Sequence, residues 1–136
     1  MMKKSNKKGF TLVELIVVIA IMAILAAVLV PTVTNKINDA NAASQATTAE
    51  NIAKTISLYL AETAEPKMSG LGTKLTEAGY AQATVTTADK TIKVKQKAND
   101  SVEYTITIGD KKATITWTDA LKKDKTLDVQ GVIAVA

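Results

Sequence analysis

The feature that most constrains this chain is a long apolar run close to its N-terminus. Residues 10–30 contain a single charge, Glu14, and one other polar side chain, Thr11, and Pro31 follows directly. At about 1.5 Å per residue, a helix of this length spans roughly 30 Å, which matches the hydrocarbon core of a bilayer. The run therefore predicts one membrane-spanning helix.

The charges are distributed unevenly on the two sides of this run. Four of the 17 lysines lie within the first eight residues, at Lys3, Lys4, Lys7 and Lys8. The rest of the chain balances 13 lysines against 13 acidic residues, so the net charge of +4 belongs to the N-terminus. By the positive-inside rule these lysines stay in the cytoplasm, and the C-terminal 100 or so residues lie outside it. No specific nucleic-acid partner is expected.

The residue types that are missing exclude whole classes of function. The chain has no arginine, histidine or cysteine. It therefore cannot form a Cys/His metal site, a Ser-His or Cys-His nucleophile pair, or a disulfide. The acidic residues form no evident cluster either, so we expect no enzymatic activity. Calcium, which oxygen ligands can hold, is the one cofactor that the sequence leaves open.

Three interpretations compete for the apolar segment. A cleaved signal peptide has a core of about 7–15 apolar residues and a small-residue cleavage site. This run is longer, and the residues around Pro31 offer no clean site. A plain membrane anchor explains the length but not Glu14, because a carboxylate inside a spanning segment costs about 2–3 kcal/mol or more. The third interpretation accounts for Glu14 and Gly9 together.

Residues 7–15 have the sequence KKGFTLVEL, directly followed by the apolar run. This stretch resembles the N-terminal signature of type IV prepilins and pseudopilins. The resemblance implies a leader, residues 1–9, that a prepilin peptidase removes between Gly9 and Phe10, with methylation of the new amino group at Phe10. It also implies a membrane platform, an assembly ATPase and minor pilins as partners of a homopolymer. Pro31 falls where many members have a helix-bending proline.

The chemistry of the segment fits this resemblance. Gly9 has weak helix preference, which lets the junction open for a protease. Cleavage there creates a cationic amine at Phe10, four residues from Glu14. A buried carboxylate is far less costly when it is paired, so Glu14 of one subunit pairing with the amine of its neighbour would favour the correct assembly register. The alternative is a carboxylate that reaches back to the membrane interface.

A second helical pattern follows Pro31. Apolar residues recur every three or four positions, with polar residues between them, at Val33, Ile37, Ala40, Ala49, Ile52, Ala53, Ile56 and Leu60. We therefore expect one helix over about residues 10–62. Its first half, residues 10–30, would lie in the membrane or filament core, and its amphipathic half, residues 31–62, would pack on a small domain. Pro31 itself would bend or loosen the helix.

The remaining residues, 63–136, have the pattern of a β domain. Pro66, Gly70 and Gly72 are expected to end the helix and open a loop. One helical turn is expected within this loop, closed by Gly79; its residues include Leu71, Leu75, Ala78 and Tyr80. Three runs of alternating apolar residues then predict an antiparallel meander, at residues 91–95, 102–108 and 113–117, with residues 84–86 or 129–135 as further edge strands. The fold class is α+β: a long helix that covers one face of a sheet of three to four strands, as in pilins.

Two charged groups in the β domain are weaker site candidates. Lys93, Lys95 and Lys97 form a basic stripe, best explained as a solvated strand face that resists edge pairing. Asp119, Asp124 and Asp128 lie in an expected loop among lysines. Major pseudopilins bind calcium near the C-terminus, which makes these carboxylates calcium candidates by resemblance, although the interspersed lysines oppose this. Asn99 begins a glycosylation-like tripeptide that a turn explains better.

The function expected from these features is structural. The chain resembles a major pilin that assembles through its N-terminal helix into a type IV pilus for adhesion, motility or surface attachment. Its lack of cysteine resembles pilins of Gram-positive bacteria, which often have no C-terminal disulfide. A pseudopilin of a type II secretion or competence system is one alternative, and a monomeric membrane-anchored binding module is another. The precursor would be a single-pass membrane protein, and the product an extracellular pilus or a pseudopilus spanning the cell wall.

Overall fold

The computed structural model describes Gly9 and residues 11–136. Two compact units divide the chain, residues 1–37 and residues 38–136. The described residues form two helices, α1 (Leu12–Glu62) and α2 (Met68–Glu77), and five strands, β1 (Ala81–Thr86), β2 (Thr91–Lys95), β3 (Tyr104–Ile108), β4 (Lys112–Thr118) and β5 (Asp124–Gln130). The predicted α+β fold, with a long N-terminal helix on an antiparallel sheet, is confirmed.

Helix α1 contributes to both units, and its burial pattern changes along its length. Its buried residues all lie in the second unit, at Thr48, Ala49, Ile52, Ile56 and Tyr59. Their spacing of three or four residues places them on one face, as the sequence pattern predicted. The helix continues through Pro31 without ending there.

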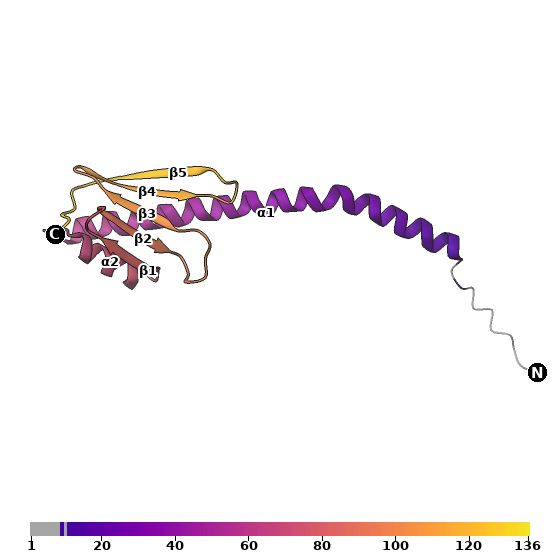
Figure 1. Ribbon diagram of the computed structural model, residues 1–136, viewed down its shortest axis with the longest axis horizontal. Helices are drawn as coiled ribbons and strands as arrows, with labels where there is room; N and C mark the ends of the chain where they lie inside the picture. Colours follow the sequence, from indigo (N-terminus) through magenta and orange to yellow (C-terminus); the bar gives the residue numbers. More distant parts are fainter. Residues whose placement is uncertain (1–8, 10) are drawn as a thin grey trace, which may run out of the picture. The chain divides into compact units, whose positions relative to one another are not determined.

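The second unit is built around a five-stranded antiparallel meander in the order β1-β2-β3-β4-β5, shown in Figure 1. The β2, β3 and β4 strands were predicted. The segment with Asp124 and Asp128 was expected to be a loop, and this was wrong: it forms β5, which pairs with β4 over seven residues. Leu127 and Val129 point toward the core with the two-residue period of a strand. The charged residues of this segment concealed that period in the sequence.

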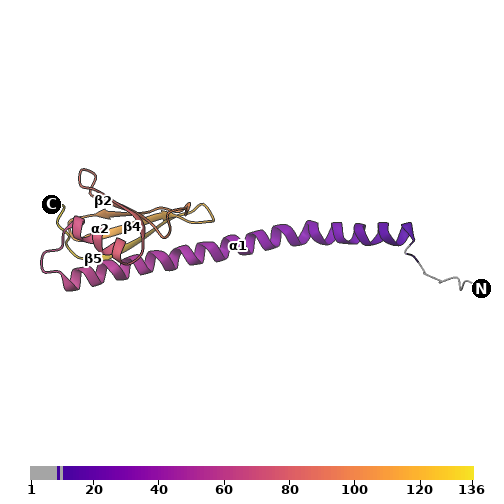
Figure 2. The same ribbon diagram turned by 90° about the horizontal axis from the view of Figure 1, so that it is seen from below.

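One face of the sheet packs against the second half of α1 (Figure 2). Ile52 and Ile56 of the helix are fully buried, as are Ile92, Ile106 and Ile115 of the central strands. A meander of this size needs such a cover for its apolar face. The core of the second unit is therefore the contact between the amphipathic half of α1 and the inward-facing aliphatic residues of the sheet.

Helix α2 occupies a segment that the sequence predicted as a loop containing one helical turn, so the extent of the helix was underestimated. Gly70 and Gly72 lie inside this helix. A side chain at Gly70 would collide with the ring of Tyr59, and one at Gly72 would lie 2.6 Å from Val85. These glycines are therefore required by close packing and do not mark a break in the helix. Gly79, with φ of +98°, ends the segment as expected.

The C-terminal tail is fixed without a disulfide. Residues Lys67 and Ala134 form a parallel β-bridge. The Ala134 N–H donates to the Pro66 carbonyl at 2.8 Å, and the Met68 N–H donates to the Ala134 carbonyl at 2.9 Å. Ile133, which directly precedes Ala134 in the tail, is buried in the core. Backbone hydrogen bonds and one apolar side chain thus hold the tail beside the start of α2.

Candidate processing and assembly site

The first turn of α1 contains a reciprocal pair of hydrogen bonds. The Glu14 N–H donates to Thr11 Oγ1 at 3.2 Å, and the Thr11 N–H donates to Glu14 Oε2 at 3.1 Å. This arrangement is a capping box, which satisfies backbone N–H groups that a helix N-terminus otherwise leaves without acceptors. The carboxylate also lies at the positive end of the helix dipole. Helix α1 therefore begins at Leu12 because Thr11 and Glu14 cap it together.

Glu14 retains capacity for a second partner. Only its Oε2 atom accepts a hydrogen bond within the described part of the chain, and the side chain is exposed. A carboxylate has two oxygens, and each can accept more than one bond. The cap and an ionic contact with an amine outside the chain are therefore chemically compatible.

The predicted cleavage site lies immediately before this cap. Gly9 is exposed, and a Cβ atom added to it would meet no atom within 4 Å. The predicted leader residues 1–8 and the predicted methylation site, Phe10, lie outside the described residues. Cleavage after Gly9 and methylation at Phe10 stay predictions, although the space around Gly9 is open to a protease.

Pro31 lies within α1 among threonines that bond to the backbone. Proline has no N–H to donate to the carbonyl four residues earlier, which weakens the helix locally. The Thr32 hydroxyl donates to the Val28 carbonyl and the Thr34 hydroxyl to the Val30 carbonyl, both at 2.9 Å. Such bonds often accompany bends in helices. The predicted bend at Pro31 stays a prediction.

The N-terminal half of α1 exposes its apolar side chains on all sides. Every large aliphatic residue from Leu12 to Val30 is at least half exposed. Among the described residues, α1 is the one helix long and apolar enough to cross a membrane. A helix that is apolar all round needs an apolar surrounding, either lipid or other helices. This half of α1 therefore meets the physical requirements of a membrane-spanning or bundled segment.

Polar contacts fix the second half of α1 to the sheet side of the unit at one end and to the start of α2 at the other. Toward its start, Gln45 Oε1 accepts from the Ala120 N–H at 2.8 Å, and the Gln45 carbonyl accepts from the Tyr104 hydroxyl at 3.2 Å. At the other end, the Tyr59 hydroxyl donates to the Lys67 carbonyl and accepts from the Lys67 N–H, both at 3.0 Å. Burial raises the pKa of Tyr104. The second half of α1 is thus held at two points along its length, by Gln45 and by Tyr59.

The three aspartates considered as calcium ligands each accept hydrogen bonds from different groups. Asp119 is buried, and its Oδ1 accepts from the N–H groups of Leu121 and Lys123, both at 2.9 Å. Asp124 accepts from the Thr118 hydroxyl at 2.8 Å. No group of three or more acidic side chains in the described part of the chain could hold a metal ion. The structure therefore does not bring Asp119, Asp124 and Asp128 together.

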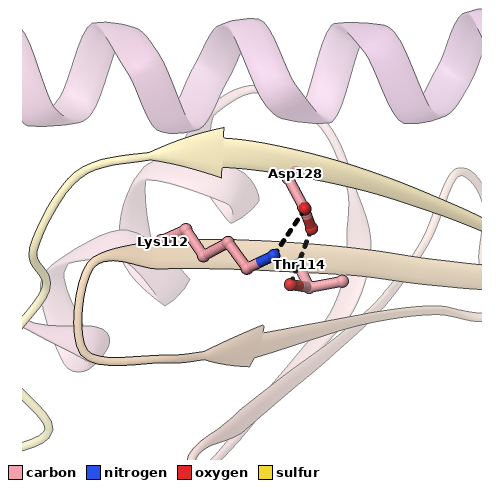
Figure 3. A network of polar contacts seen from close by, with 3 residues as sticks. All are labelled: Lys112, Thr114 and Asp128. Carbon is pink, nitrogen blue, oxygen red and sulfur yellow. Dashed lines mark hydrogen bonds and ion pairs between the residues drawn. The ribbon is translucent and has the colours of Figure 1, made fainter.

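Asp128 belongs to a small network on the outer face of the sheet, shown in Figure 3. It accepts from Lys112 Nζ at 2.7 Å and from the Thr114 hydroxyl at 2.8 Å. The hydrogen bond from Lys112 is the main reason why the pKa of Asp128 is lowered, and the Thr114 bond adds to it. Between α2 and the end of α1, a hydrogen bond to Glu62 raises the pKa of Lys74.

The basic stripe is partly neutralised. Lys93 Nζ lies 3.5 Å from Glu103 Oε1, and both side chains are about half exposed. Lys93 and Lys95 lie on β2, and Lys97 lies in the loop after it. Lys93 is exposed, as expected of a solvated face. The expected role in resisting edge pairing was wrong, because β2 pairs with β1 on one side and β3 on the other.

Sequence reasoning identified Glu14 but missed the residue that holds it. The spacing Thr-x-x-Glu at the start of an apolar run is the known signal for a capping box, so Thr11 was identifiable. Gln45 and Tyr59 had no comparable signal, because their roles depend on residues far away in the sequence.

Comparison with known proteins bears on the N-terminal segment. A family model, the prokaryotic N-terminal methylation motif, matches residues 4–30. A search of curated proteins finds no significant match. A search of solved structures finds none either. The match covers the basic stretch, Gly9, the capping box and the apolar run. The chain therefore has the N-terminal methylation motif with an apolar helix behind it, which supports a type IV prepilin- or pseudopilin-type protein.

Proposed function

We propose that this protein is the major structural subunit of a type IV pilus, processed after Gly9 and polymerised through the N-terminal half of α1. The observation that supports this most is the combination of a half-helix whose large aliphatic residues are all at least half exposed with a second half that has one face buried by its own unit. The first half has no partner within the described chain, which is what a segment destined for a bilayer and then for a helical bundle requires.

In this proposal Glu14 has two successive roles. In the membrane its carboxylate caps α1 together with Thr11, which reduces the cost of placing a polar group near lipid. During assembly it pairs with the amine of Phe10 on a neighbouring subunit, because a paired carboxylate tolerates burial better than a single one. The ion pair stabilises the axial position of the subunit at which the two groups meet.

The partners and location follow from the same proposal. A prepilin peptidase removes residues 1–9, and a membrane platform with its ATPase extracts the subunit from the membrane. The second unit lies outside the cytoplasm throughout. A secretion or competence pseudopilus would use the same N-terminal segment, so immunogold labelling decides between them: a surface pilus gives labelled fibres that extend well beyond the cell wall.

The yield of sheared fibres from cells that express the full chain with its native export machinery tests the assembly role. We expect Glu14→Ala to lose most of this yield, because the intersubunit ion pair and half of the cap disappear. Thr11→Val removes only the hydroxyl that caps the helix, and we expect a smaller loss. Glu50→Ala is the matched control, since Glu50 is an exposed glutamate on the second half of α1.

Trp117 provides the folding control for these variants. It is the only tryptophan in the chain and is buried in the second unit, so its fluorescence reports the folding of that unit. Glu14→Ala with native fluorescence and few fibres supports the proposal. Normal fibre yield from Glu14→Ala would contradict the register role. A chain that keeps residues 1–9 and stays monomeric would instead support a membrane-anchored binding module.

A further inference from the structure

Strand β5 forms one edge of the sheet, and its outer side has no partner strand within the described chain (Figure 1). It pairs with β4 over seven residues without a shift in register. The strand at the opposite edge, β1, has a shift between Ala81 and Thr84, and irregularities of this kind hinder pairing with another chain. Of the two edges, β5 is therefore the one that offers a regular template for a further strand.

The hydrogen bonds at the two ends of the β4–β5 ladder establish which backbone groups point outward. The Gly131 N–H donates to the Lys111 carbonyl and the Asp119 N–H to the Lys123 carbonyl, both at 2.9 Å. Hydrogen-bonded and non-hydrogen-bonded pairs alternate along an antiparallel ladder, so the odd-numbered residues of β5 bond to β4. The even-numbered residues direct their N–H and C=O groups to the open edge, where no strand of the described chain receives them.

The charges of β5 favour one register for antiparallel pairing with a second copy of the same strand. Because the even-numbered residues carry the open groups in both copies, they must lie opposite one another. Centring the pair on Lys125 places two lysines opposite each other, and centring it on Thr126 or on Asp128 places two aspartates opposite each other. Like charges directly opposite are destabilising. Centring the pair on Leu127 pairs all seven residues and avoids every such clash.

In this register each carboxylate of β5 lies opposite a neutral hydrogen-bond donor of the second copy. Asp128 lies opposite Thr126, and Asp124 lies opposite Gln130; all four side chains are exposed. A hydroxyl or an amide can donate to a carboxylate, and such bonds are charge-assisted. Asp128 already accepts two bonds within its own sheet, one through each oxygen, and each oxygen can accept a further bond. The edge is therefore complementary to itself.

A groove runs beside this edge. It is lined by residues 53, 54, 57 and 58 of α1 and by residues 128–130 of β5. Leu58 is 51% exposed there, and Leu127 of β5 is only partly buried. A second copy at the edge can therefore cover apolar side chains as well as satisfy the open backbone groups.

We propose that two copies of this chain pair edge to edge through antiparallel β5 strands, with Leu127 of one copy opposite Leu127 of the other. The contact uses the same surface on both copies, so it joins them in pairs and does not propagate. It lies outside the assembly role assigned to the N-terminal half of α1 and does not depend on it.

The direction of the paired strands defines what the contact connects. Helix α1 follows β5 in the same direction, from Gln45 beside Ala120 to Leu58 near Val129. The second halves of α1 therefore run in opposite directions in the pair. Subunits of a filament built from heterologous contacts share one direction. In a pilus, the β5 contact would therefore link two fibres that lie side by side.

Disulfide trapping tests the contact, because the chain contains no cysteine of its own. Opposite residues of a non-hydrogen-bonded pair have Cα atoms about 4.5 Å apart, which lies within the range that a disulfide can bridge. We expect oxidation of the full-length Leu127→Cys chain, dispersed in excess detergent, to give at least ten times more covalent dimer than Thr107→Cys. Thr107 is the matched control, because it is exposed on β3, which has a strand on each side. A non-reducing gel measures the dimer.

Mixed chains test the register at exposed positions. Thr126→Cys and Asp128→Cys chains, one of them tagged, should cross-link to each other several-fold more than either does to itself. In the Leu127→Cys chain, Thr126→Asp places a second carboxylate opposite Asp128 and should lower the dimer yield several-fold. Thr126→Lys places an ammonium group there and should raise it. Native Trp117 fluorescence confirms that each variant is folded.

The outcomes separate this inference from the proposed function, because dispersed chains and not fibres are measured. A dimer yield from Leu127→Cys no higher than that from Thr107→Cys, together with no preference for the mixed pair, would overturn the edge contact and leave the pilus proposal intact. Responses of the same sign to Thr126→Asp and Thr126→Lys would overturn the register. Failure of the wild-type chain to form fibres would overturn the pilus proposal alone.

Discussion

The two halves of helix α1 have the same backbone structure and opposite requirements. In the first half Ile19 is 56% exposed, and the large aliphatic residues around it are similarly exposed. In the second half Ile56 is fully buried against the sheet. One half takes its stability from other residues of the chain, and the other presents an apolar surface that only lipid or further copies can cover. The difference indicates that a folded unit with its own buried core begins at about residue 38.

The difference also separates the functions of the two parts. The N-terminal part holds the methylation motif, the capping box and the apolar surface, which together suit processing and polymerisation. The second unit holds the apolar core and the hydrogen-bonded turns, which give it a fold of its own. Unfolding of the full chain in detergent tests this division. The fluorescence of Trp117 reports the unfolding of the second unit.

The largest effect should come from a matched pair of substitutions within α1. Ile56→Ala removes a fully buried side chain from the core, and we expect the free energy of unfolding to fall by about 2–5 kcal/mol. Ile19→Ala makes the same chemical change at an exposed position, and we expect no change in the unfolding of the second unit. Urea denaturation measures both. Equal losses from the two variants would show that the halves are not independent in the way described.

Gly70→Ala should have the next largest effect. Alanine is a better helix former than glycine by up to about 1 kcal/mol, so propensity alone predicts a more stable α2. The added methyl group collides with Tyr59, whose hydroxyl holds Lys67, and overpacking of this kind costs about 1–3 kcal/mol. We therefore expect a lower urea midpoint.

Ser69→Ala is the control for Gly70→Ala, because Ser69 is an exposed neighbour on the same helix. It should leave the midpoint unchanged or raise it slightly. A higher midpoint for Gly70→Ala would contradict the packing role of Gly70. It would mean that Tyr59 can move away from the added methyl group without loss of stability.

A moderate effect is expected at the β4–β5 turn. Asp119→Ala leaves two backbone N–H groups without their acceptor, which should cost about 1 kcal/mol or more. Asp119→Asn retains an oxygen at the same position and should cost less. A calcium titration of the wild-type chain accompanies this measurement: if the carboxylate serves only the turn, calcium should not raise the midpoint, and a clear rise would contradict that assignment.

The smallest effect expected is on the loss of stability at low pH. The pKa of Asp128 is lowered in the folded chain by the Lys112 hydrogen bond, so its contribution is present above the ordinary aspartate pKa of about 3.9 and is lost as pH falls through the lower folded value. Wild-type stability should therefore decline below about pH 4, and Asp128→Asn should make this decline slightly shallower. Urea midpoints at pH 7 and pH 3 measure the difference. An identical slope in Asp128→Asn would contradict the assigned role.

The sequence predicted the parts of this molecule in which local periodicity and tertiary structure agree. The helix and the central strands were predicted because Ile52 and Ile56 repeat with the helical period and the residues of β2 alternate. Helix α2 was predicted only as a single turn, because Gly70 appears as a helix breaker until its contact with Tyr59 is known. Strand β5 was missed because its charges outweighed the alternation of Leu127 and Val129.

The candidate site shows the same limit. Glu14 was recognised because a single charge in an apolar segment has a cost that demands a reason. Its capping partner, Thr11, is local and was within reach of sequence analysis. The contacts of Gln45 were not, because Gln45 meets Tyr104 and Ala120 only after the helix packs on the sheet.

The most direct test of the division between the two halves is the intact mass of the protein recovered from cells with its native export machinery. We predict a mass that lacks residues 1–9 and carries one additional methyl group, since the N-terminal half is then the processed and assembling part. An uncut mass, in cells shown to process another prepilin, would contradict this account and leave the N-terminal half as a simple membrane anchor.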